Sequence, residues 1–222
     1  MRAFQGSTYM TEEKRKLMKV FFEKYGFKMF VTLLFAGLVV SVFFWINQSP
    51  TLPVLKQAPN FTLNDLEGKN VQLSDSNGKV RLVEFMFTSC PDICPMTTFN
   101  MVKLQDELKK SSQWGSQVQF LSVTFDPLKD TPEVFKKYGD RMRIDYSGWT
   151  LLTGTEAETA EVAKSFGVLV QKMPDGQFVH TVTSLFLIDG SGKIRKIFAM
   201  GDQMDNQEIL KSIRQIADPA SK

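Results

Sequence analysis

The chain has 222 residues, of which 43% are hydrophobic and 23% charged, and its formal net charge is +3. This composition is typical of a globular protein and shows neither low complexity nor internal repeats. Residues 1–28 alone carry a net charge of +4, from seven Lys/Arg and three Glu, so the rest of the chain sums to −1 and lacks the clustered basic residues of a nucleic-acid-binding protein.

The first predicted element is an apolar segment, residues 29–46, which reads MFVTLLFAGLVVSVFFWI and contains no charge. As a helix, a segment of this length nearly spans a hydrocarbon core of about 30 Å. A buried core helix and a cleavable signal peptide are the alternatives. However, no small-x-small cleavage site follows, and Phe43, Phe44 and Trp45 resemble an interfacial aromatic belt. The sequence therefore predicts an uncleaved transmembrane anchor.

Charge on either side of this segment predicts its orientation. The basic residues 1–28 precede it, whereas Lys56 is the only basic residue among the 18 that follow it. The positive-inside rule then places residues 1–28 in the cytoplasm and the C-terminal domain on the outer face of the cell membrane. Residues 47–57, with Pro50 and Pro53, are predicted to form an extended linker, and a folded domain is expected over residues 58–219.

Strand and helix patterns alternate along this domain. Two short alternating segments joined by Glu67-Gly68 predict a β-hairpin, and the apolar run at residues 80–87 is typical of a strand buried on both faces. Helices are then expected over residues 95–110, from Pro132 after the cap Thr131, over 158–166 and over 209–216, with strands over 118–125, 150–152, 185–188 and 194–198. This order predicts an α/β sandwich.

Cys90 and Cys94 are the only cysteines, and they lie in FTSCPDICPM, between the predicted buried strand and the helix that follows it. The positive end of a helix favours thiolates, which metal binding and disulfide exchange both require. Cysteines four apart on one helical turn would share a face as a soft bidentate ligand, whereas thioredoxin-type redox pairs have a two-residue spacer. A structural disulfide closing so short a loop would gain little. The spacing therefore favours a metal site, and redox chemistry stays open.

His180 is the only histidine in the chain. A single histidine is more often a structural or surface residue than a ligand. Here it comes just before a strand expected to neighbour the cysteine-bearing one, and an imidazole beside two thiolates would give a Cys₂His set suited to copper. Met96 follows the cysteine motif directly, but methionine more commonly fills gaps in a core.

Taken together, these motifs resemble the Sco/SenC family, copper-binding thioredoxin-like proteins that serve cytochrome c oxidase assembly. The resemblance covers about residues 58–217 and is strongest in FTSCPDICP, which is close to the family's C-P-D-x-C-P signature. It also includes GKVRLVEFMFTSC, WTLLTG and VHTVTSLFLIDGSGKI. SVTFDPLKDTP is similar to the family's S-V-D-P-x-x-D-T-P segment but has one extra residue.

The resemblance implies a thioredoxin-like fold with an N-terminal β-hairpin extension. It also implies a copper ion, Cu(I) or Cu(II), bound by Cys90, Cys94 and His180. Asp126 would be a further participant, although an Asp before Pro127 is first of all turn chemistry. The function implied is that of a metallochaperone for the dinuclear copper centre, with the oxidase's copper-binding subunit as partner, and we expect a monomer. Two alternatives stay open: a thiol-disulfide oxidoreductase that reduces that subunit's cysteines, with Cys90 as the attacking sulfur, and a redox sensor without turnover.

Overall fold

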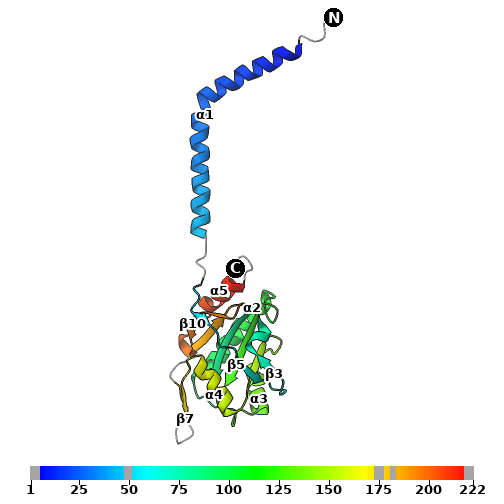
Figure 1. Cartoon of the computed structure of the whole chain (residues 1–222), viewed down its shortest axis with the longest axis vertical. Helices are drawn as coiled ribbons and strands as arrows, with labels where there is room; N and C mark the ends of the chain where they lie inside the picture. Colours follow the sequence, from blue (N-terminus) through cyan, green and yellow to red (C-terminus); the bar gives the residue numbers. More distant parts are fainter. Residues whose placement is uncertain (1–5, 48–51, 173–177, 181–183, 218–222) are drawn as a thin grey trace. The chain divides into compact units, whose positions relative to one another are not determined.

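A computed structural model of the chain describes residues 6–47, 52–172, 178–180 and 184–217, and for residues 6–13, 44–47, 171–172 and 178–180 it describes the backbone alone. The chain divides into two compact units, Met1–Pro50 and Thr51–Lys222 (Figure 1). Among the described residues, the first unit contains a single helix, and the second contains the mixed α/β fold that carries both cysteines.

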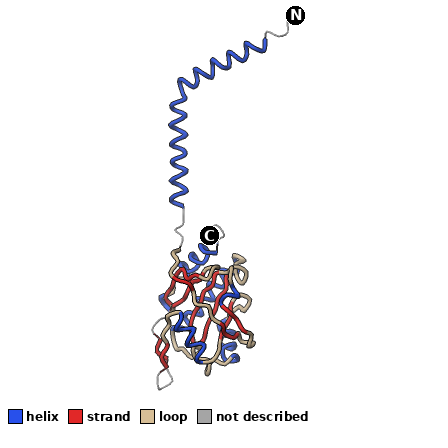
Figure 2. The backbone as a smooth tube through the Cα atoms, in the orientation of Figure 1, coloured by secondary structure: helices blue, strands red, loops and turns tan. Residues whose placement is uncertain are grey.

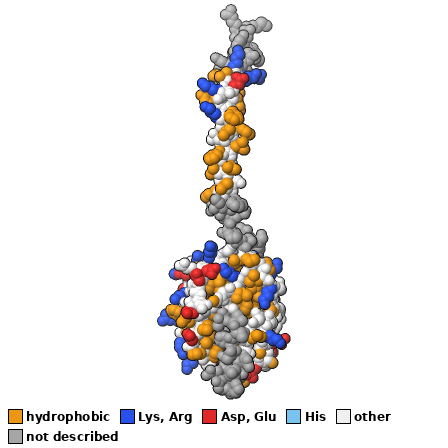
Figure 3. All heavy atoms as spheres, turned by 90° about the vertical axis from the view of Figure 1, so that its left-hand side faces the viewer, with side chains coloured by type: hydrophobic (Ala, Val, Ile, Leu, Met, Phe, Trp, Pro, Cys, Tyr) orange, Lys and Arg blue, Asp and Glu red, His pale blue; other side chains and the backbone are white. Residues whose placement is uncertain are grey.

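The first unit consists of helix α1 (Gly6–Asn47). Its segment Lys14–Phe43 has an 18-residue window with a mean hydropathy of 2.0, and none of that window is buried. Hydrophobic side chains follow the helix, with Lys and Arg gathered toward its N-terminal part (Figure 3). This confirms the expectation of an apolar helix long enough to cross a membrane. The helix begins at Gly6, so the charged residues ahead of the apolar run are also helical.

The second unit is built from short strands and four α-helices, with strands and helices layered against one another (Figure 2). The strands are β1 (Lys56–Gln57), β2 (Thr62–Asn64), β3 (Asn70–Gln72), β4 (Val80–Met86), β5 (Val118–Thr124), β6 (Trp149–Leu152), β7 (Val170–Lys172), β8 (Phe178–His180), β9 (Ser184–Ile188) and β10 (Lys193–Ala199). The helices are η1 (Leu73–Ser76), α2 (Ile93–Lys110), α3 (Pro132–Met142), α4 (Glu156–Ser165), η2 (Gly201–Gln203) and α5 (Asn206–Ala217).

Six strands form the central sheet, in the order β1-β10-β9-β4-β5-β6. β4, β5 and β6 run parallel, while β9 lies antiparallel to β4 and β10 antiparallel to β9. Every residue of β4 is buried, as the apolar run at residues 80–87 predicts for a strand covered on both faces. The prediction that the strand after His180 neighbours the cysteine-bearing strand is confirmed, because β9 pairs with β4.

The predicted hairpin before the first buried strand is also present, as β2 paired antiparallel with β3. Its turn uses Gly68 at a φ of +81°, a left-handed conformation that side chains other than glycine rarely adopt. Thr131 caps α3 by accepting a hydrogen bond from the Val134 amide, with Pro132 in the first turn, as the sequence predicts.

Candidate metal and thiol site

The two cysteines lie at the junction between β4 and α2. Cys90 is in the loop after β4, and Cys94 is in the first turn of α2. Both are free thiols, with 9% and 2% of their surfaces exposed. The two cysteines do not share one helical turn, because α2 begins only at Ile93. The loop nevertheless folds back onto the helix, so that the Cys94 amide donates a hydrogen bond to Cys90 Sγ at 3.4 Å.

Hydrogen bonding distinguishes the two sulfurs. The hydrogen bond to Cys90 raises the pKa of the Cys94 thiol well above its usual range, and burial raises it further. Cys90 Sγ accepts hydrogen bonds from Cys94 at the N-terminus of α2, where the helix dipole favours negative charge. Without a bound ion, the Cys94 thiol is therefore held in its protonated form.

The start of α2 is held in place by the loop after β10. The Gly201 amide donates to Thr97 Oγ1 at 2.9 Å, and the Asn100 side-chain amide donates to the Gly201 carbonyl at 3.2 Å. Gly201 has a φ of +74° and lies next to Ile93. These contacts fix the first two turns of α2, and with them the position of Cys94.

Asp130 ties the cysteine loop to the end of β5. Its carboxylate accepts hydrogen bonds from the Thr88 amide at 3.0 Å, from Thr88 Oγ1 at 2.5 Å and from Thr124 Oγ1 at 2.5 Å. Asp130 is fully buried, and this burial raises its pKa despite these hydrogen bonds. Asp130 is not among the site residues that the sequence predicts, although DPLKDTP carries it as a second Asp after Asp126.

Asp126 closes a turn with its backbone and buries a carboxylate that has no hydrogen bond among the described residues. Its carbonyl accepts the amides of Lys129 and Asp130, which closes the turn expected before Pro127. Its carboxylate is buried, and neither oxygen has a hydrogen-bond partner among the residues that the structure describes. Lys129 Nζ forms a long ion pair with Asp126 Oδ2 at 3.7 Å. The participation of Asp126 in a metal site stays a prediction.

Glu84 is a fully buried carboxyl group, six residues before Cys90 on β4. Its Oε1 accepts a hydrogen bond from Ser122 Oγ at 2.5 Å, and Ser122 in turn accepts one from Trp149 Nε1 at 2.8 Å. Its Oε2 has no hydrogen-bond partner in the described part of the chain. Burial raises the pKa of Glu84 to about 7, and the charged form of Glu84 raises the pKa of Cys94. Sequence reasoning missed this residue, whose only signal is a single Glu inside an apolar run.

His180 is the last residue of β8, where its backbone pairs with Val170 of β7. Its side chain lies outside the described residues, so its predicted role as a ligand is not tested. Among the described side chains, no group of three or more His, Cys, Asp and Glu is arranged to hold a metal ion. Two adjacent thiols are nevertheless soft donors, and soft donors fit copper or another thiophilic metal.

Most of the second unit is similar in sequence to known proteins of one family. The SCO1/SenC family model matches residues 51–218. The "SCO1 protein homolog" of Bacillus subtilis strain 168 is 32% identical over 166 residues, which cover 73% of this chain and 83% of the homolog.

Two solved structures resemble the fold. BsSco, described as a member of the Sco family of cytochrome c oxidase assembly proteins with a disulfide switch, has a TM-score of 0.66 at 30% identity, covering 76% of this chain and 98% of BsSco. ScoI of Arabidopsis thaliana, solved with copper bound, has a TM-score of 0.60 at 28% identity, covering 71% of this chain and 98% of that protein. The thioredoxin-like fold expected from the sequence is thereby confirmed.

Proposed function

The chain belongs to the SCO1/SenC family, and on that premise we propose that it is a membrane-anchored copper-binding protein that helps to assemble the copper centre of cytochrome c oxidase. One observation carries the proposal: the only two cysteines of the chain are buried, unbridged and in hydrogen-bond contact at a helix N-terminus. Copper bound to ScoI and the oxidase-assembly role given for BsSco support the same function here.

The proposed ligands are Cys90, Cys94 and His180, with Asp126 as a further, outer participant. Two thiolates and an imidazole suit copper in preference to hard cations such as magnesium. The site requires both thiols to lose their protons, so copper binding releases protons and strengthens with rising pH. The hydrogen bonds of Asp130 and Gly201 keep the loop and the helix in place while the ligands exchange.

As a metallochaperone, the protein carries copper as its cargo. The ion passes to the copper-binding subunit of the oxidase by ligand exchange, in which a ligand of the subunit replaces one of the protein's own ligands at each step. Cys90 is the first thiolate to release the ion, because it lies in the loop and is more exposed than Cys94. Cys94, in the first turn of α2, is the more firmly placed of the two.

A second function, reduction of a disulfide in the same subunit, is favoured by the hydrogen bond from the Cys94 amide to Cys90 Sγ, which holds the two cysteines side by side. The Cys90 thiolate attacks one sulfur of the target disulfide and displaces the other as a thiolate. Cys94 then loses its proton and attacks Cys90 Sγ, which releases the second target thiolate and leaves a Cys90–Cys94 disulfide. Two electrons pass to the target, and an external thiol must reduce the protein again. A redox sensor would use the same oxidation without turnover.

Membrane anchoring by α1 completes the proposal. Residues 1–28 face the cytoplasm, residues 29–46 span the membrane, and residues 47–57 connect them to the domain at residues 58–219 on the outer face of the cell membrane. The greater positive charge before the apolar run supports this orientation. Protease added to intact cells should digest the domain, and a domain that stays protected until the membrane is permeabilised would contradict the orientation.

Copper titration of the reduced full-length chain in detergent, without oxygen, tests the metal site. We expect one Cu(I) per chain, loss of binding in Cys90→Ser and Cys94→Ser, and at least tenfold weaker binding in His180→Ala. Met96→Leu is the matched control, since Met96 is an exposed sulfur next to the motif and is not a proposed ligand. Unchanged affinity in His180→Ala would show that the Cys₂His site is wrong.

Reduction of a model disulfide by the same variants separates the two functions. His180→Ala should still reduce it at a rate close to that of the parent, because the reaction needs only the two sulfurs. If the parent reduces no disulfide but binds copper, the reductase function is excluded. If it reduces disulfides and binds no copper, the metallochaperone function is excluded.

A further inference from the structure

Helix α1 is longer than a bilayer requires. Its 42 residues would extend about 63 Å at 1.5 Å per residue, which is twice the hydrocarbon core of about 30 Å. The uncharged run at residues 29–46 supplies the part that crosses. Residues 6–28 are helical as well, but they carry six Lys/Arg and three Glu, so they belong outside the hydrocarbon core.

This basic segment of α1, residues 6–28, has an apolar face. Five side chains recur at i, i+1, i+4, i+5 and i+8, the spacing of one helix face: Leu17, Met18, Phe21, Phe22 and Tyr25. Each has between 41% and 67% of its surface exposed. An exposed apolar face is unfavourable in water, and a helix that packs against nothing is only marginally stable there. The face therefore calls for a covering surface.

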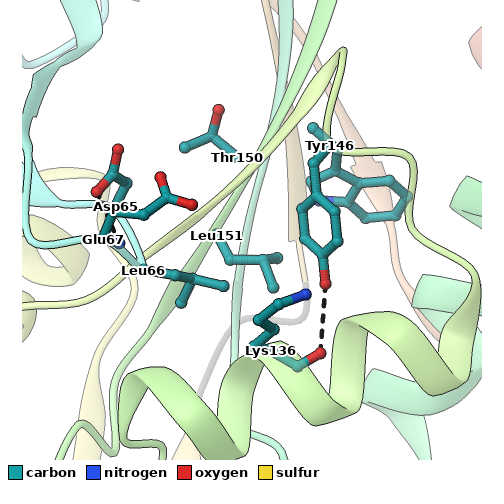
Figure 4. Close-up of a pocket in the computed structure, with 8 residues that line it drawn as sticks. Asp65, Leu66, Glu67, Lys136, Tyr146, Thr150 and Leu151 are labelled. Atoms are coloured by element: carbon teal, nitrogen blue, oxygen red, sulfur yellow. Dashed lines mark hydrogen bonds between the residues drawn. The ribbon is translucent and has the colours of Figure 1, made fainter.

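A comparison of two equally exposed tyrosines, Tyr25 and Tyr146, shows what is missing at α1. Both are 41% exposed. Tyr146 lines a cavity of about 260 Å³ in the second unit, where its hydroxyl hydrogen-bonds to the Lys136 carbonyl at 3.3 Å and to Asp140 Oδ1 at 2.9 Å (Figure 4). The ring contacts described for Tyr25 come from α1 itself, namely the Phe21 ring at 5.3 Å and Lys24 Nζ at 5.7 Å. In the proposed topology the folded domain lies across the bilayer, so it cannot cover this face.

The charges of the basic segment surround the apolar face. At 3.6 residues per turn, the opposite face holds Glu12, Arg15, Lys16, Lys19 and Glu23. The other four charges lie at the ends or borders of the apolar face, where the long stems of lysine can carry the ammonium groups to the headgroups: Glu13, Lys14, Lys24 and Lys28. Six basic and three acidic residues give the segment a net charge of +3. An apolar face with Lys and Arg around it is typical of a helix that lies on an anionic membrane.

The junction between the basic segment and the apolar run allows a change of direction. Gly26 lies just before the run, and Thr32 Oγ1 donates back to the Lys28 carbonyl at 2.8 Å, a contact that often bends helices. Figure 1 shows α1 bending between its dark-blue N-terminal part and the lighter-blue remainder. The basic segment can therefore turn toward the plane of the membrane while α1 stays a continuous helix.

We propose that residues 6–28 lie along the cytoplasmic surface of the membrane, with the apolar face at the boundary between headgroups and acyl chains and with Lys and Arg on anionic lipid headgroups. This inference rests on the proposed membrane anchoring and orientation. The apolar run holds the segment beside the bilayer, which gives the two a high effective concentration. A second copy of the chain is a poorer cover, because it would bring like charges together, whereas anionic lipid complements them.

Spin labels can measure how deeply each face lies. The full-length chain with Cys90→Ser and Cys94→Ser receives one nitroxide, at Met18→Cys on the apolar face or at Glu23→Cys on the opposite face. It is reconstituted at one chain per nanodisc in a two-to-one mixture of phosphatidylcholine and phosphatidylglycerol. Collisions of the label with oxygen, which concentrates in hydrocarbon, are compared with collisions with a water-soluble nickel complex. We expect an oxygen-to-nickel ratio at least threefold higher at residue 18 than at residue 23, and equal ratios would overturn the proposal.

Anionic lipid and basic side chains should both be required. Pure phosphatidylcholine, or the charge reversals Arg15→Glu and Lys16→Glu together, should lower the ratio at residue 18 at least threefold. Lys137→Glu with Lys164→Glu makes the same charge change at exposed positions of the second unit and should leave the ratio unchanged. A ratio that ignores lipid charge would overturn the proposal. So would a high ratio seen only with two chains per disc, which would assign the face to a second copy.

A third label, at Leu38→Cys inside the apolar run, separates this proposal from the anchor on which it rests. A label at residue 38 that is accessible to oxygen alone, with equal ratios at residues 18 and 23, would keep the anchor and reject the surface helix. Nickel access at residue 38 would contradict the anchor itself, and the surface helix would be rejected with it.

Discussion

The two faces of the central sheet are built from the same strands and differ in chemistry. On one face of β4, Phe85 packs against Phe166 and Phe186, with ring centroids 5.3 and 6.1 Å apart, and Phe61 adds to the cluster. On the other face, Glu84 begins the hydrogen-bonded series with Ser122 and Trp149. Alternation along a strand thus separates a face that contributes mainly packing from one that places polar groups near the dithiol.

The polar face extends into the helices that cover it. Thr98 of α2 donates to the Cys94 carbonyl and lies 2.8 Å from the Tyr138 hydroxyl of α3. Burial raises the pKa of Tyr138 beyond its usual range, and the charged forms of Glu84 and Cys94 raise it further. The groups around the dithiol therefore influence one another's protonation, which the aromatic face cannot do. Substitutions on the aromatic face should therefore change mainly the stability, and substitutions on the polar face should also change the chemistry of the thiols.

The largest expected effect is on the aromatic face. Phe166→Ala removes a side chain that contacts three other rings, and we expect the free energy of unfolding to fall by about 3–5 kcal/mol. Urea unfolding of the detergent-solubilised chain, followed by tryptophan fluorescence, measures the loss. The alkylation rate of the cysteines under native conditions should match that of the parent, and a changed rate would mean that the two faces are coupled.

On the polar face, Glu84 should make stability depend on pH. Burial raises its pKa from 4.5 to about 7, so between these pH values the folded protein binds more protons than the unfolded chain. The free energy of unfolding should therefore fall as pH rises through this window, by a total of about 3 kcal/mol, and level off above it. Glu84→Gln removes the titration and should remove most of this fall.

Urea unfolding of parent and Glu84→Gln between pH 4 and 8 measures this difference. At pH 8 the variant should be the more stable protein, and at pH 4 the two should be similar, because Glu84 is then mostly protonated in both states. Parallel pH dependences for the two proteins would show that Glu84 is not the group responsible. Ser122→Ala is a useful companion, since it removes the hydrogen bond that favours the charged form of Glu84.

A smaller effect is expected where the polar face meets the cysteine loop. Asp130→Asn keeps the shape of the side chain but replaces one acceptor oxygen with a donor, opposite groups of Thr88 and Thr124 that donate. We expect a loss of about 1–3 kcal/mol and faster alkylation of Cys90, because the loop two residues away is released. The same loss of stability without faster alkylation would mean that Asp130 stabilises the end of β5 and does not hold the cysteine loop in place.

The smallest effects are expected at the helix caps, which compare α3 and α4 directly. Thr155 and Glu158 form a reciprocal capping box on α4, with hydrogen bonds of 3.2 and 2.8 Å, whereas Thr131 accepts a single bond of 3.4 Å at α3. Substitution of either Thr by Ala should cost about 1 kcal/mol, with the larger loss for Thr155. A larger loss at Thr131 would show that this residue has a role beyond capping.

Much of the fold follows from local sequence. The apolar run of β4, the Glu67-Gly68 turn and the Thr131-Pro132 helix start each specify their own conformation, because burial on two faces, a left-handed turn and a capped helix depend on neighbouring residues. The sequence predicts the start of α2 two residues too late. Pro95 is a strong signal for the first turn, but the helix already begins at Ile93, which leaves Cys94 inside it and Cys90 outside.

Some residues of the site can likewise be found from the sequence, and others only from the structure. Cys90 and Cys94 stand out as the only cysteines, and His180 as the only histidine, so a search for chemistry finds them in the sequence. Glu84 and Asp130 do not stand out, since their importance comes from burial and from partners 38 and 42 residues away.

The sequence by itself determined the family, the apolar helix, the order of strands and helices and the reactive residues, because these depend on composition, on motifs and on local periodicity. The tertiary structure decided that Cys90 lies before α2 and contacts Cys94, that Glu84 is buried with its pKa raised to about 7, and that Asp130 joins two loops. Each of these depends on segments far apart in the chain, whose meeting is fixed by packing in three dimensions and leaves no local pattern in the sequence.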